Sequence, residues 1–189
     1  MPRKLTQTSP GPGEPGGYDP PQGLSPRGTL AYWAGYHGRV GELTDITALK
    51  KALTMLRADR FRLFADVGPD QVVGIVGSQS SPNRLYSCRL TSGGGFTCCT
   101  QNLIACVVGH RSPCKHLLVL ILGLVHAGRL DPETAIDWLS MAQGRPTASI
   151  ADARVRDAMA ETFLRHKGVQ VGEVDWRPTE TIPEDFYTL

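Results

Sequence analysis

The chain has 189 residues, of which 41% are apolar, and a formal net charge of +2 at pH 7. This size and composition suffice for one compact domain with a modest hydrophobic core, and they argue against a second independent domain. The first residues, Met1 to Lys4, run into polar, proline-rich sequence without an apolar segment, which argues against a secretory signal or a membrane anchor. We therefore expect a cytoplasmic protein that makes no contact with membranes.

The two ends of the chain differ in composition from its middle. Residues 1–26 are rich in proline and glycine, and they cannot bury enough apolar surface to offset the conformational entropy lost on ordering. We expect them to form a disordered arm. Residues 168–189 carry aromatic side chains among acidic ones without a period, which indicates a tail. A single α+β domain is therefore expected at residues 27–167.

The domain is expected to begin with aromatic anchors and one helix. Aromatic residues are concentrated in the segment 32–36. After them, apolar residues recur at helical spacing over residues 46–56, and either Thr44 or Asp45 can cap that helix.

Two β-hairpins are predicted next. Their strands are residues 61–67 with 71–76, and residues 85–90 with 96–99. The glycines between the second pair supply turn conformations that other residues reach only at a cost. Together the four strands would form a small antiparallel sheet.

Three further helices are predicted beyond the second hairpin. Residues 117–125 are almost continuously apolar, but they are about half as many as the ~20 that a membrane span needs. We expect them to form a buried core helix. Pro132 begins another helix, and residues 150–166 form the last one.

Cysteines and a histidine are concentrated where the hairpin and the buried helix meet. The chain has five cysteines, an odd number, and in a reducing cytosol such residues are metal ligands more often than disulfide partners. Cys114 and His116 lie where the apolar helix begins, so both side chains can face one ion. A tetrahedral zinc ion needs two more donors, which Cys98, Cys99 and Cys106 can supply.

These residues resemble the SWIM zinc finger over residues 84–128. That family has Cys-x-Cys on a hairpin, a variable spacer, and Cys-x-His running into a helix, as in Cys114-Lys115-His116 here. Its members are taken to bind DNA or other proteins. In this chain the first half is an adjacent pair, Cys98 and Cys99, so the resemblance leaves open which thiol is the ligand. The implied fold is α+β, with a sheet of two hairpins, a zinc-stapled helix and flanking helices.

Strand geometry offers one way to choose between the two thiols. With the predicted turn, Leu90 would pair with Phe96 and Cys88 with Cys98, which places Cys98 on the apolar face of the hairpin. Cys99, where the strand ends, would be freer to reach the ion. The preferred ligands are Cys99, Cys106, Cys114 and His116, with Cys98 as the substitute for Cys99, Cys88 as a buried structural thiol and His110 as a loop residue.

The same residues favour a binding module over an enzyme. No acidic residue that could orient a catalytic histidine lies between residues 71 and 130, and the chain has no Cys-x-x-Cys motif and no phosphate-binding loop. A zinc ion with four protein ligands also lacks the open position that catalysis requires.

We expect a protein–protein adaptor, with residues 32–36 and 176–187 as docking elements. The sequence around Cys98-Cys99 and Cys114-Lys115-His116 resembles a bacterial subgroup of SWIM proteins associated with MoxR-type AAA ATPases and von Willebrand A proteins, which implies a partner of that kind. The alternative is nucleic-acid binding, although the acidic residues from position 131 onward would repel phosphate. The basic residues available for it are Arg84, Arg89, Arg111, Lys115 and Arg129.

Overall fold

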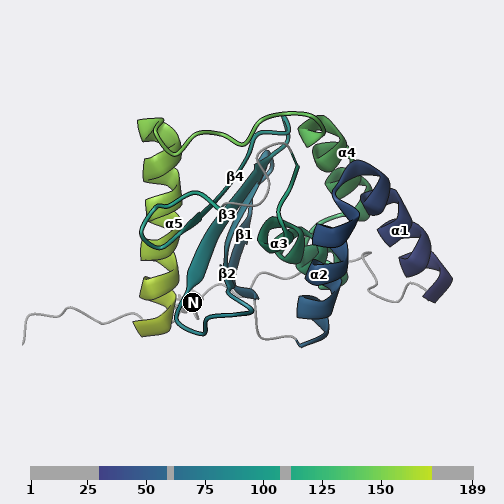
Figure 1. Ribbon diagram of the computed structural model, residues 1–189, viewed down its shortest axis with the longest axis horizontal. Helices are drawn as coiled ribbons and strands as arrows, with labels where there is room; N and C mark the ends of the chain where they lie inside the picture. Colours follow the sequence, from purple (N-terminus) through teal and green to yellow (C-terminus); the bar gives the residue numbers. More distant parts are fainter. Residues whose placement is uncertain (1–29, 59–61, 107–111, 172–189) are drawn as a thin grey trace, which may run out of the picture.

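The computed structural model describes residues 30–58, 62–106 and 112–171, whose arrangement Figure 1 shows. Within these ranges the elements follow the order α1 Leu30–Leu43, α2 Ile46–Arg57, β1 Arg62–Val67, β2 Gln71–Gly77, β3 Leu85–Thr91, β4 Phe96–Thr100, α3 Lys115–His126, α4 Pro132–Ala142 and α5 Ala153–Val171. The fold is α+β, as expected. The predicted arm at 1–26 and the tail beyond residue 171 lie outside the described residues.

The four strands form one antiparallel sheet in the order β1-β2-β3-β4, as the two hairpins predict. Leu90 pairs with Phe96 and Cys88 pairs with Cys98, so the predicted register of the second hairpin is confirmed. Helix α3 packs against one face of the sheet and α5 against the other (Figure 1). Because α2 and α4 pack on α3 in turn, α3 is enclosed between the sheet and other helices.

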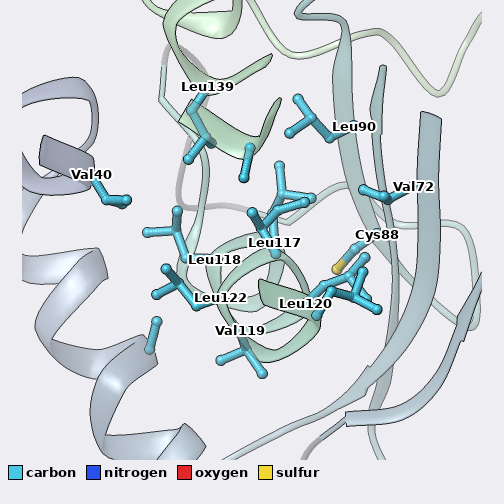
Figure 2. Packing of buried hydrophobic residues seen from close by; sticks show 14 of the residues in the cluster. Val40, Val72, Cys88, Leu90, Leu117, Leu118, Val119, Leu120, Leu122 and Leu139 are labelled. Carbon is cyan, nitrogen blue, oxygen red and sulfur yellow. The ribbon is translucent and has the colours of Figure 1, made fainter. Parts of the chain in front are cut away.

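Helix α3 forms the centre of the main hydrophobic core. Its residues 117–122 are at most 1% exposed. Figure 2 shows Leu120 pointing toward the sheet beside Cys88, whereas Leu118 and Leu122 point toward the helices on the other side. Burial on all sides explains why this helix has an almost continuous apolar sequence instead of a single apolar stripe.

Gly74 in β2 allows α3 to approach the sheet closely. A Cβ atom at this position would lie 2.5 Å from Leu120 Cδ1 and 2.6 Å from the carbonyl oxygen of Phe64. Both distances are well below van der Waals contact, so a larger residue would displace either the helix or strand β1. This contact fixes the distance of α3, and therefore of its first turn, from the strands.

A second, smaller core lies on the opposite face of the sheet, beneath α5. It contains Ile75 and Cys99 from the strands and Met159 and Phe163 from the helix. Cys98, by contrast, belongs to the main core around α3. Successive residues of a strand point to opposite faces, so the two neighbouring cysteines lie in different cores.

The helices at the start of the domain agree with the prediction only in part. Helix α2 begins where expected, because the Asp45 side chain accepts a hydrogen bond from the Ala48 N–H and caps it. The sequence predicts aromatic anchors but no helix over 30–43, yet the structure has α1 there. Burial of Tyr36 and Val40 offsets the low helix propensity of the glycines in this segment.

Candidate metal centre

Three cysteines and one histidine converge at the N-terminal end of α3. The donor atoms of Cys98, Cys106, Cys114 and His116, which we call the Cys3His cluster, all lie within 4.8 Å of one another. His116 Nδ1 is 3.9 Å from the Cys98 sulfur and 3.7 Å from the Cys106 sulfur. Sulfur and imidazole nitrogen are the usual ligands of structural zinc, which takes four of them. The cluster could therefore hold a metal ion.

The chain brings Cys106 beside Cys98 by turning back after β4. The Leu103 N–H donates to the Thr100 carbonyl at 2.8 Å, and Leu103 has a φ of 57°, which is uncommon for a residue with a side chain. The returning segment then pairs with the strand, since the Cys106 N–H donates to the Cys98 carbonyl at 2.9 Å. This short turn positions the second thiol of the cluster next to the first.

The first turn of α3 supplies the other two donors. Cys114 is the N-cap residue and has an extended backbone, and its side chain makes no capping hydrogen bond, so its sulfur remains available to a metal. His116 follows within the first turn. Both residues are only 4% exposed. The main core, which anchors α3, therefore also holds these two donors in place.

Tyr86 forms part of the wall of this site, and sequence analysis missed it. Its ring stacks on the imidazole of His116. A signal for this contact was present, because Tyr86 precedes Cys88 by two positions in β3 and so faces the same side of the sheet.

Proximity and burial keep two thiols of the cluster, Cys98 and Cys114, protonated. Hydrogen bonding to Cys106 is the main cause that raises the pKa of Cys98 and of Cys114 well above the ordinary thiol value, and burial raises both further. Zinc binds thiolates, so an ion entering the cluster would displace these protons and supply the compensating positive charge. The donor types, their number and their burial all fit a structural zinc ion.

The structure corrects the preference for Cys99 over Cys98. The predicted strand register is right, but the apolar face that carries Cys98 is the face on which α3 lies, so this thiol points toward Cys114 and His116. Cys99 faces α5, where burial raises its pKa to about 12. The choice between them required knowledge of which face of the sheet α3 covers.

The remaining cysteine, Cys88, is buried, as expected for a structural thiol. Its sulfur lies 3.7 Å from that of Cys98, across the strand pair. Burial raises its pKa, which keeps it a neutral thiol. It lies beside the Cys3His cluster without being a member of it.

The other histidines lie apart from the cluster. His37 and His126 contact each other, with their Nε2 atoms 3.0 Å apart. His166 is a buried residue of α5 and lies beside Phe64, on the sheet face that α5 covers. His110, the alternative loop histidine, lies outside the described residues.

Comparison with protein families, with curated proteins and with solved structures finds no match to this chain. In the part of the chain that the structure describes, no helix has both the length and the apolar character needed to cross a membrane.

Proposed function

We propose that the Cys3His cluster binds one zinc ion and that the chain is a SWIM-like interaction module. The observation that carries this proposal is the convergence of four donor atoms within 4.8 Å. They come from β4, from the segment after it and from the start of α3, so one ion would join the sheet to the central helix. Because the free energy of metal binding becomes folding free energy in such sites, the ion would act as a structural staple.

A structural role agrees better with this donor set than catalysis does. Three thiolates and one imidazole complete the tetrahedral coordination of zinc and leave no position for a water molecule or a substrate. The function of the module would then depend on its surfaces, which argues for binding rather than for an enzyme.

The contacts of the basic residues favour a protein partner over nucleic acid. Arg89 Nε donates to Gln71 Oε1 at 2.9 Å, and Arg129 Nη2 donates to the Ala65 carbonyl at 3.1 Å. Arg111 lies outside the described residues. Nucleic-acid binding needs several cations that can contact phosphates, and two of the five candidates already bind groups of the protein itself. We therefore favour a protein–protein adaptor.

The aromatic segment 32–36 is a weaker docking element than its sequence indicates. Tyr36 is 3% exposed and Trp33 packs against the main core, whereas Tyr32 is 46% exposed. The other expected docking element, residues 176–187, lies outside the described residues and remains our proposed site of contact. The SWIM resemblance supports an AAA ATPase or a von Willebrand A protein as the partner.

Metal analysis of protein purified from a reducing cytosol tests the zinc proposal. We expect about one zinc ion per chain. Cys98→Ser should lose the metal, whereas the matched variant Cys99→Ser, which alters the neighbouring thiol on the opposite face, should retain it. Protein that folds without zinc, or equal metal loss in both variants, would refute the proposal.

Partner capture tests the adaptor role separately. The full chain and a chain ending at residue 171 can be compared for binding to purified MoxR-type ATPase and von Willebrand A proteins, with DNA binding measured across a salt series. We expect capture by the full chain and weak, salt-sensitive DNA binding. Tight DNA binding at physiological salt that is lost in Arg111→Ala and Lys115→Ala would instead establish the nucleic-acid alternative.

A further inference from the structure

A cavity of about 260 Å³ lies beside the Cys3His cluster, between α2, the end of β2 and the first turn of α3. Cys106, Cys114 and His116 form the part of its wall that is shared with the cluster. The polar side chains that line the rest include Asp45, Thr47, Lys51, Ser78, Ser80 and Lys115. The sequence gives no hint of this cavity, because its walls come from segments that lie far apart in the sequence.

Two helix N-termini meet at the cavity. Asp45 and Cys114, the N-cap residues of α2 and α3, both line it. The two helix ends are adjacent, since the Asp45 N–H donates to Ser112 Oγ at 3.2 Å. Each helix has 12 residues, so two helix dipoles direct their partial positive charge toward one volume. Such helix ends favour anions.

Two lysines add full positive charges to the same wall. In the described ranges neither Lys51 nor Lys115 forms an ion pair with a carboxylate. One carboxylate, that of Asp45, also lines the cavity, but one of its oxygens accepts the Ala48 N–H at 2.7 Å as the cap of α2. The ammonium groups of the wall therefore outnumber its carboxylates.

His116 contributes a buried nitrogen without a partner. Its Nδ1 lies near the sulfurs of Cys98 and Cys106, whereas its Nε2 is buried and has no hydrogen-bond partner among the described residues. An imidazole that holds a metal through Nδ1 carries its hydrogen on Nε2. Ligating histidines usually donate that hydrogen to an acceptor, which the described residues do not supply, and His116 also lines the cavity.

We propose that this cavity binds a phosphate group, either as inorganic phosphate or as a monoester. A phosphate has up to two negative charges and several acceptor oxygens, so it matches two lysines, two helix ends and the hydroxyls of Thr47, Ser78 and Ser80. A carboxylate has one charge and two oxygens and would leave most of these donors unused. The site goes beyond the structural zinc ion and the adaptor role.

Calorimetric titration of the zinc-loaded full chain with inorganic phosphate, at constant ionic strength, tests the proposal. We expect saturable binding that Lys51→Ala weakens by about tenfold, the usual loss for one charge-assisted contact. The matched control is Lys50→Ala, which removes the neighbouring lysine of α2 that does not line the cavity. Asp45→Asn keeps a good capping residue but removes the negative charge, so it should strengthen binding.

Several outcomes would overturn the proposal. They are the absence of saturable binding, equal weakening by Lys50→Ala and Lys51→Ala, or acetate binding as tightly as phosphate. A phosphoserine peptide and its unmodified form, titrated in parallel, distinguish a phosphorylated protein from a small phosphate monoester as the source. Zinc content is measured for every variant, so failure of the zinc proposal appears in the metal analysis and failure of the phosphate proposal in the titration.

Discussion

The ring of Tyr86 lies nearly parallel to the imidazole of His116, with ring centroids 3.7 Å apart and an angle of 16° between the planes. The tyrosine thereby restrains the orientation of the one nitrogen ligand in the Cys3His cluster. Residues that orient a metal ligand influence metal affinity even when they do not touch the ion.

Tyr86→Ala should weaken zinc binding on the order of tenfold, because His116 would lose the ring that restrains it. Competition with a chromophoric chelator measures this change. Tyr86→Phe keeps the stacked ring and should bind zinc almost as tightly as the unaltered chain. If both variants lost zinc equally, the hydroxyl rather than the ring would be important.

Gly74→Ala should destabilise the protein by about 1–3 kcal/mol, because the added methyl group would overlap with Leu120 and with the Phe64 carbonyl. Denaturant unfolding of the zinc-loaded protein measures the loss. A stability equal to that of the unaltered chain would mean that α3 and the sheet can separate at no cost.

Gly35→Ala and Gly38→Ala should each stabilise the protein, by about 0.5–1 kcal/mol, since alanine has the higher helix propensity. Apart from the helix's own neighbouring backbone, no atom of the described residues lies within 4 Å of a Cβ at either position, so the added methyl groups meet no obstacle there. Gly41→Ala should gain less, because its Cβ would lie 3.4 Å from side-chain atoms of Ile46 and Leu49. Unfolding midpoints of the three variants should therefore separate into two groups.

The free energy of unfolding should decrease as the pH is lowered below about 6.5, the ordinary histidine pKa. Burial lowers the pKa of His166 and that of His37, so the unfolded chain binds a proton more readily than the folded chain does. Each such histidine has one pKa in the unfolded chain and a lower pKa in the folded chain. As the pH falls from the first value to the second, the histidine lowers the free energy of unfolding by at most about 1.4 kcal/mol per pH unit. Unfolding curves between pH 7.5 and 5.5 measure the slope.

His166→Leu isolates one of these contributions. The residue is 3% exposed and both of its ring nitrogens are buried without a hydrogen-bond partner in the described structure, so an apolar side chain should be tolerated. The variant should show a shallower loss of stability toward low pH. Acid would also release a bound metal ion, so the quantity to compare is the difference in free energy of unfolding between the variant and the unaltered chain at each pH. If the free energy of unfolding of the variant had the same slope against pH as that of the unaltered chain, His166 would not contribute to the pH dependence.

The elements that were predicted correctly are those that short stretches of sequence specify. The apolar run 117–125 fixes a buried helix, and the turn between β3 and β4 fixes the pairing of Leu90 with Phe96. The capping role of Asp45 depends only on residues within one helical turn. In each case the physical cause lies within a few residues of its effect.

The elements that were missed depend on contacts between distant segments. Helix α1 forms because Tyr36 and Val40 are buried, although its glycines disfavour a helix. The ligand choice between Cys98 and Cys99 depends on the face that α3 covers, which the pattern of the strands alone does not reveal. The cavity near Lys51 likewise exists only once segments that lie far apart in the sequence have come together.

The adjacent thiols at positions 98 and 99 bear on which alignments of β4 a metal ion would tolerate. If β4 slipped by one residue against β3, Cys99 would replace Cys98 beside α3, and a metal ion would still find a sulfur there. The same slip would turn Phe96 out of the main core and bring the hydroxyl of Thr97 into it. An ion would thus accept either alignment, so the pairing of Phe96 with Leu90 in the main core, and not the metal, would favour the observed one.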